Sequence, residues 1–64
     1  MNLEWSYLTP RQQAALEALE HTGLCRLPGE VGEQLYNLGL AEIVDAGVYC
    51  LSATGATVLP VTVH

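Results

Sequence analysis

Residues 31–55 read VGEQLYNLGLAEIVDAGVYCLSATG, and this stretch decides the fold. It opens with Val31, Leu35 and Leu38, whose spacing puts three apolar side chains on one face of a helix. Gly39 follows, and glycine is the residue that most readily takes the left-handed conformation at a helix end. The sequence therefore predicts an amphipathic helix that stops at Gly39.

A β-hairpin is predicted after this helix. Residues 40–44 and 48–51 are rich in β-branched and aromatic side chains, and Asp45-Ala46-Gly47 between them suits a three-residue loop with Gly47 at positive φ. In this register four side chains share one face of the hairpin: Ala41, Ile43, Tyr49 and Leu51. A two-residue turn at residues 46–47 would turn one strand over relative to the other, and we favour the longer loop.

Another helix is predicted upstream, because Thr9 can cap it, Pro10 suits its first position and Gln12 completes a capping box. It runs from Pro10 to about Thr22 and ends at Gly23. Its buried face contains Ala15, Leu16 and Leu19, and its opposite face contains Gln13, Glu17 and Glu20.

The remaining segments are short. Residues 24–27 form a connector or a third strand beside the hairpin, and Pro28 starts the helix that contains Val31. Ser52 caps a third helix over residues 53–59, which Gly55 weakens and Pro60 ends. At the N-terminus Leu3, Trp5 and Tyr7 alternate with polar residues, which fits a strand or a short helical turn, and the tail Val61-Thr62-Val63-His64 is β-prone.

The order helix, LGL, hairpin, LSATG over residues 8–59 resembles the second half of a winged helix-turn-helix domain, in which the hairpin is the wing. The sequence departs from that pattern because residues 24–38 leave room for only one helix where a full helix-turn-helix needs two. We predict a single α+β domain over residues 1–64. It would contain two main helices, a short C-terminal helix and a small antiparallel sheet.

Charge is the most informative part of the composition. The chain has seven Asp and Glu residues and two Lys or Arg residues, Arg11 and Arg26, so its net charge is −5. Duplex DNA carries a charge about every 1.7 Å of its axis, and its ligands neutralise several phosphates with Lys or Arg. We therefore expect no direct binding to nucleic acid. The simpler alternative is that the acidity only keeps an apolar small protein in solution.

Acidic residues occupy the positions that a winged-helix DNA binder uses to contact DNA. Glu30 and Glu33 lie together on the exposed face of the second helix, and the wing carries Glu42 and Asp45. We expect these four carboxylates, extended by Glu17 and Glu20, to contact a basic protein that normally binds nucleic acid. An alternative interface is an apolar patch that includes Trp5 or residues 61–63.

Size, acidity and the shortened winged helix are similar to small phage-encoded DNA mimics, the anti-CRISPR proteins. That resemblance implies an inhibitor that blocks a nucleic-acid-binding host defence complex. Two other classes stay open: a winged-helix module used for assembly, for example as a homodimer, and a DNA-binding transcriptional regulator.

We expect no enzyme, cofactor or metal. Ser6 and Ser52 lie in turn or cap contexts, and no triad or phosphate-binding loop is present. Cys25 and Cys50 are expected to be free thiols, and Gly23 separates His21 from Cys25, which argues against a zinc site completed by Cys50 and His64. We expect neither a membrane span nor a signal peptide, and hence a cytoplasmic protein, in a bacterial host cell if it is phage-encoded.

Overall fold

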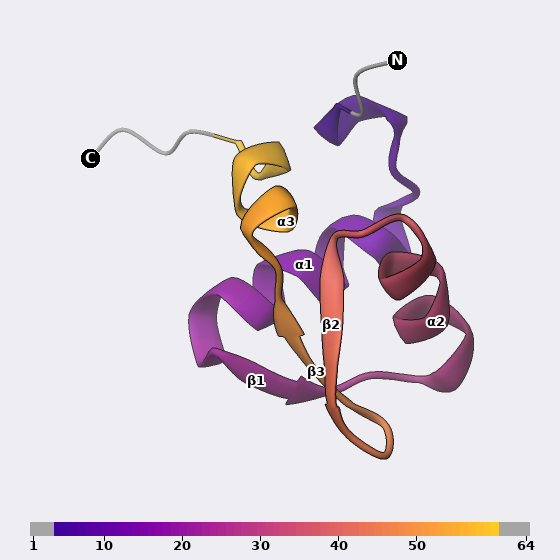
Figure 1. Ribbon diagram of the computed structural model, residues 1–64. Coiled ribbons are helices and arrows are strands. Elements are labelled where there is room, and N and C mark those ends of the chain that lie inside the picture. Colours follow the sequence, from indigo (N-terminus) through magenta and orange to yellow (C-terminus); the bar gives the residue numbers. More distant parts are fainter. Residues whose placement is uncertain (1–3, 61–64) are drawn as a thin grey trace.

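The computed structural model describes residues 4–60 and shows an α+β fold with a small antiparallel sheet, as predicted (Figure 1). Its layout is winged-helix-like, with one helix between the first strand and the hairpin. The elements are η1 (Trp5–Tyr7), α1 (Pro10–Thr22), β1 (Leu24–Arg26), α2 (Gly29–Asn37), β2 (Ala41–Asp45), β3 (Val48–Leu51) and α3 (Ala53–Val58).

Helix α1 begins and ends where the sequence predicts. The Thr9 hydroxyl accepts the Gln12 backbone N–H at 3.2 Å, and the Gln12 side chain accepts the Thr9 N–H at 3.0 Å, so the capping box forms. Gly23 ends the helix at φ 83°, and its N–H donates to the Leu19 carbonyl. The predicted buried residues Ala15, Leu16 and Leu19 are all buried.

Helix α2 ends at Gly39 as predicted, but its buried face differs from the prediction. Gly39 has φ 78°, and the next N–H, from Leu40, donates to the Leu35 carbonyl at 2.9 Å. Leu38 is 44% exposed, because it lies beyond the last helical turn, so its assignment to the apolar face was wrong. Gly32 is buried in its place, and an added Cβ there would lie 2.6 Å from the Tyr49 Cζ. The missing side chain lets α2 approach the sheet closely.

The sheet has the order β1-β3-β2, and both pairings are antiparallel. Residues 24–26 are thus a third strand, one of the two alternatives for this segment. Ala41 pairs with Leu51 and Ile43 with Tyr49, so the predicted face is confirmed. The loop itself is shorter than predicted, because the strands end at Asp45 and Val48. Between Ile43 and Asp45, β2 contains one unpaired residue, Val44. This extra residue compensates for the shorter loop, so the two strands keep the register that a three-residue loop would give.

Both ends of the described chain pack onto the core. Residues 5–7 form a 3-10 turn, the second alternative for this segment, and Trp5 is half-buried against the core. The Gln13 side chain donates to the Trp5 carbonyl at 2.9 Å and is half-buried, so its assignment to the solvent face was wrong. Leu3 and the β-prone tail lie outside the described residues.

Helix α3 packs by means of its glycine. Ser52 caps the helix, because its hydroxyl accepts the Gly55 N–H at 2.9 Å. We expected Gly55 to weaken this helix, yet Gly55 is buried, and an added Cβ would overlap the Leu40 carbonyl oxygen. Gly55 is the contact point that lets α3 rest on the backbone before β2. The helix ends at Val58, one residue before the predicted end.

One hydrophobic core joins these elements. In Figure 1, α1 runs behind the strands and α2 lies beside β2, and both helices contact the sheet. Four side chains are fully enclosed: Leu16, Leu19, Leu35 and Leu40. Tyr49 points into this core, whereas Leu24 and Glu42, on the other face of the sheet, are exposed.

Candidate partner-binding surface

Helix α2 presents carboxylates to solvent. Glu30 and Glu33 are exposed and stand one helical turn apart, with Cβ atoms about 5–6 Å from each other. Val31 and Leu35 are buried on the opposite side of the helix. No Lys or Arg occurs anywhere in residues 27–64. The solvent face of α2 is therefore acidic, as predicted.

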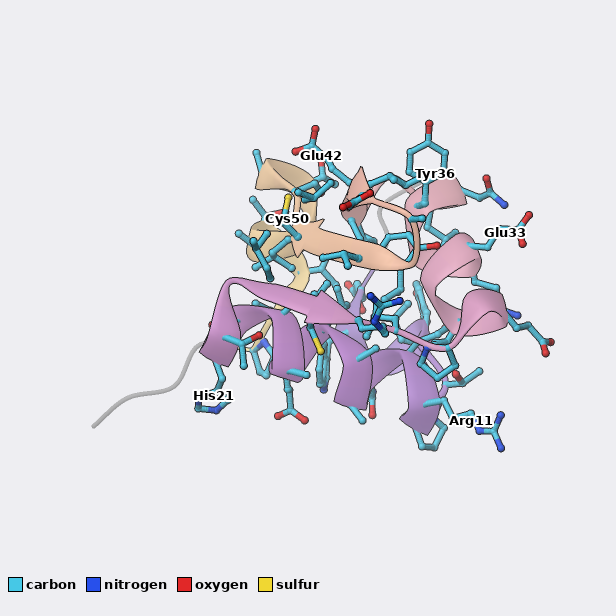
Figure 2. All side chains as sticks on the ribbon, turned by 90° about the horizontal axis from the view of Figure 1, so that it is seen from below. Arg11, His21, Glu33, Tyr36, Glu42 and Cys50 are labelled. Carbon is cyan, nitrogen blue, oxygen red and sulfur yellow. The ribbon has the colours of Figure 1, made fainter. Side chains whose placement is uncertain are left out.

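The wing adds two more carboxylates. Glu42 pairs with Cys50 in the sheet, so its side chain leaves from the face opposite Tyr49 and the core. Asp45 lies at the hairpin loop, and its carboxylate accepts the Ala46 N–H at 2.7 Å. In Figure 2, Glu42 projects from the top of the view and Glu33 projects outward from α2 at the right. We call the four residues Glu30, Glu33, Glu42 and Asp45 the α2–wing surface.

The two α1 carboxylates are placed differently. Glu17 and Glu20 are exposed on α1, which packs on the core face of the sheet. Glu17 lies on the side of α1 that faces away from its buried residues, whereas Glu42 leaves from the opposite face of the sheet. Figure 2 likewise shows α1 residues Arg11 and His21 on the side away from Glu42. The structure thus separates the six predicted residues into two sets on different elements.

One arginine lies near the wing. Arg26 pairs with Val48, and its Nη1 atom would be 3.3 Å from a Cβ added to Gly47, so its side chain lies along the hairpin loop. The other cation, Arg11, is on α1. One guanidinium therefore lies along the loop that follows Asp45, and the other cation lines a groove together with Glu30.

Sequence reasoning missed a group of exposed apolar side chains. Tyr36, Leu38, Ile43 and Val44 are each between 44% and 56% exposed, and they come from the end of α2 and from β2, two elements in contact. We call these four residues the β2-edge patch. The helical period predicted that Leu38 is in the core, and the apolar interface predicted as an alternative contained Trp5 instead. The signal available was the hairpin itself, because a third strand beside it leaves one hairpin strand at the edge of the sheet.

A groove also lies between the first turns of α1 and α2. Its volume is about 770 Å³, and its lining is mostly apolar, with Arg11 and Glu30 among its polar members. The Gln12 side-chain amide donates to the Gln34 side chain at 2.9 Å and ties the two helices together. The groove follows from the angle between the helices, which the sequence does not specify.

Metal binding and disulfide formation find no support in the described part of the chain. Among residues 4–60, no group of three or more His, Cys, Asp or Glu side chains is placed to hold a metal ion. Cys25 pairs with Tyr49, whereas Cys50 pairs with Leu24, so the two free thiols leave from opposite faces of the sheet. Within the same residues no helix is long and apolar enough to cross a membrane.

Comparison with protein-family models, with curated proteins and with solved structures finds no match to this chain.

Proposed function

We propose that this chain is an acidic protein-binding inhibitor, similar to phage-encoded anti-CRISPR proteins, which mimics DNA and blocks a protein that normally binds nucleic acid. One observation carries the proposal. The helix and the wing that would contact DNA in a winged-helix protein expose Glu30, Glu33, Glu42 and Asp45, and no Lys or Arg follows Arg26 in the sequence.

Electrostatics favours this proposal over direct DNA binding. Two arginines neutralise at most about two phosphates, and the net charge of −5 repels the others. Arginine side chains on a nucleic-acid-binding partner receive a carboxylate in much the same way as a phosphate. The separation of Glu30 and Glu33, about 5–6 Å between Cβ atoms, is comparable to the spacing of phosphates along a strand.

The β2-edge patch favours a second candidate, an assembly module that binds another subunit. Its four apolar residues are about half-exposed and lie on two adjacent elements. Hydrophobic residues scattered singly over a surface need no explanation, but a group of them suggests a binding surface. In this alternative the carboxylates serve solubility, and the binding energy comes from apolar burial.

Charge reversal separates the two candidates. The tagged chain would first capture its partner from a bacterial extract. If the chain and DNA compete for the same site on the partner, a DNA oligonucleotide should then release the partner from the chain. Glu30→Lys combined with Glu33→Lys should abolish capture and remove its salt dependence. The matched control is Glu17→Lys with Glu20→Lys, which changes the net charge equally on α1 and should reduce binding far less.

Circular dichroism of both variants should match that of the wild type, because all four glutamates are exposed. Unchanged affinity in the α2 variant would refute the mimicry proposal. A loss of equal size in both variants would show that only net charge matters, and would also refute a specific α2–wing contact.

A further inference from the structure

The groove between the first turns of α1 and α2 is held open by contacts within the chain. The capping box of Thr9 and Gln12 fixes the start of α1, and the Gln12 side-chain amide also donates to Gln34 of α2 at 2.9 Å. Pro10 is the first residue of α1 and Pro28 precedes α2, and the ring of each proline restricts its backbone. A ligand would therefore find the groove already formed.

Small side chains leave the groove hollow. Ala14 is exposed on its α1 wall, and the buried residues that line it are Ala15, Leu27 and Val31. These three are only 7–8% exposed and belong to the hydrophobic core, so they form the floor of the groove. The volume of about 770 Å³ lies within the range of ligand-binding pockets, about 300–1,000 Å³. A large apolar side chain seated here would contact the core directly.

Opposite charges on the two walls indicate the chemistry of the occupant. Arg11 lines the groove from α1 and Glu30 lines it from α2, and both residues are exposed. A guanidinium is attracted to the face of an aromatic ring by the ring quadrupole. A carboxylate forms charge-assisted hydrogen bonds with Arg or Lys, and Glu33 extends this negative wall by one helical turn. An aromatic residue with a cationic neighbour matches both walls.

We propose that the groove binds an aromatic side chain of the basic partner, with Arg11 against the ring and a neighbouring Arg or Lys of the partner against Glu30. This inference rests on the proposed function, because it specifies how the basic partner is anchored. A few aromatic and arginine side chains in well-packed pockets carry most of the binding energy of protein interfaces, whereas exposed ion pairs contribute little. The carboxylates would thus select the partner, and the groove would hold it.

The test uses the unaltered chain and a short capped peptide in which one tryptophan lies between two arginines. The ring current of the bound indole should shift the methyl protons of Ala14, Ala15 and Val31 upfield during an NMR titration. An analogue with alanine in place of tryptophan keeps both charges but buries much less apolar surface. It should bind about tenfold more weakly or worse.

Substitutions in the chain test the same contact from the other side. Ala14→Leu fills the groove without changing any charge, and it should weaken binding of the tryptophan peptide about tenfold or more. The matched control is Ala56→Leu, which adds the same side chain at an exposed position of α3 and should leave the affinity unchanged. Arg11→Gln should reduce the preference for tryptophan over leucine at the same peptide position about two- to fivefold; the two peptides carry equal charge. An unchanged preference would overturn the contact with Arg11.

The outcomes separate this inference from the proposed function. If the alanine and tryptophan peptides bind equally well, with amide shifts confined to Glu30 and Glu33, the groove is not used and the acidic function stays intact. Unchanged affinity in Ala14→Leu, or methyl resonances that do not move, would also overturn the groove. If an analogue with serine in place of both arginines binds as tightly, the basic occupant and the charge-based function fail together.

Discussion

Gly55→Ala tests how α3 is held against the sheet. Glycine inside a helix is normally destabilising, and its replacement by alanine gains up to about 1 kcal/mol. Here the added Cβ would overlap the Leu40 carbonyl oxygen and lie 2.9 Å from both the Leu40 carbonyl carbon and the Leu51 Cδ1. Two of these atoms belong to the backbone and cannot rotate away, so the helix itself must move.

The cost of that movement exceeds the gain in helix propensity. Overpacking typically costs about 1–3 kcal/mol. Displacing α3 also strains the 2.6 Å hydrogen bond from the Ser52 hydroxyl to the Gly39 carbonyl, worth about 0.5–1.5 kcal/mol. Subtracting the propensity gain leaves a net loss of about 1–3 kcal/mol. That is a large part of the total stability, about 3–10 kcal/mol, expected for a chain of this length.

Urea denaturation followed by circular dichroism measures the effect, and Gly29→Ala is the matched control. Gly29 is the first residue of α2, and nothing lies within 4 Å of a Cβ added there. We expect Gly29→Ala to be neutral or slightly stabilising. If Gly55→Ala proves as stable as the wild type, α3 does not rest on the Leu40 backbone and the reasoning fails.

Three further predictions concern the core, the cap and DNA. Leu35→Ala should lower the free energy of unfolding by about 2–5 kcal/mol, because Leu35 is fully buried, whereas Leu38→Ala should cost about 0.5 kcal/mol or less; equal effects in urea denaturation would refute the assigned face. Thr9→Ala removes the capping box and should cost about 1 kcal/mol in the same assay, and an unchanged midpoint would argue against the cap. The chain should not shift duplex DNA in gels at about 0.15 M salt, and a micromolar shift that survives this salt would overturn the charge argument.

The residues that stabilise this domain are different from those that determine its surface charge. The core consists of apolar residues, and no polar or charged side chain is buried in the described residues 4–60. The carboxylates of the α2–wing surface are exposed. Replacing them therefore changes the charge of the surface, but it neither creates a cavity nor buries a charge. This arrangement is what makes charge reversal an informative experiment on so small a domain.

Local chemistry determined where the elements begin and end. Thr9 and Gln12 satisfy the free N–H groups at the start of α1, and Gly23, Gly39 and Gly47 take positive φ where the chain must turn. These signals depend on neighbouring residues alone. The sequence therefore predicted the helices, the hairpin and its register, and the acidic character of the exposed face of α2.

Contacts between elements decided the rest, because they join residues far apart in the chain. Gly32 and Gly55 look like weak points in isolated helices, and only the positions of Tyr49 and Leu40 show them to be sites of close approach. Whether Leu38 and Ile43 are buried depends on where α2 ends relative to β2. The separation of Glu17 from Glu42 depends on which face of the sheet α1 covers. The sequence by itself supplied the carboxylates and their elements, and tertiary packing decided which of them share a surface.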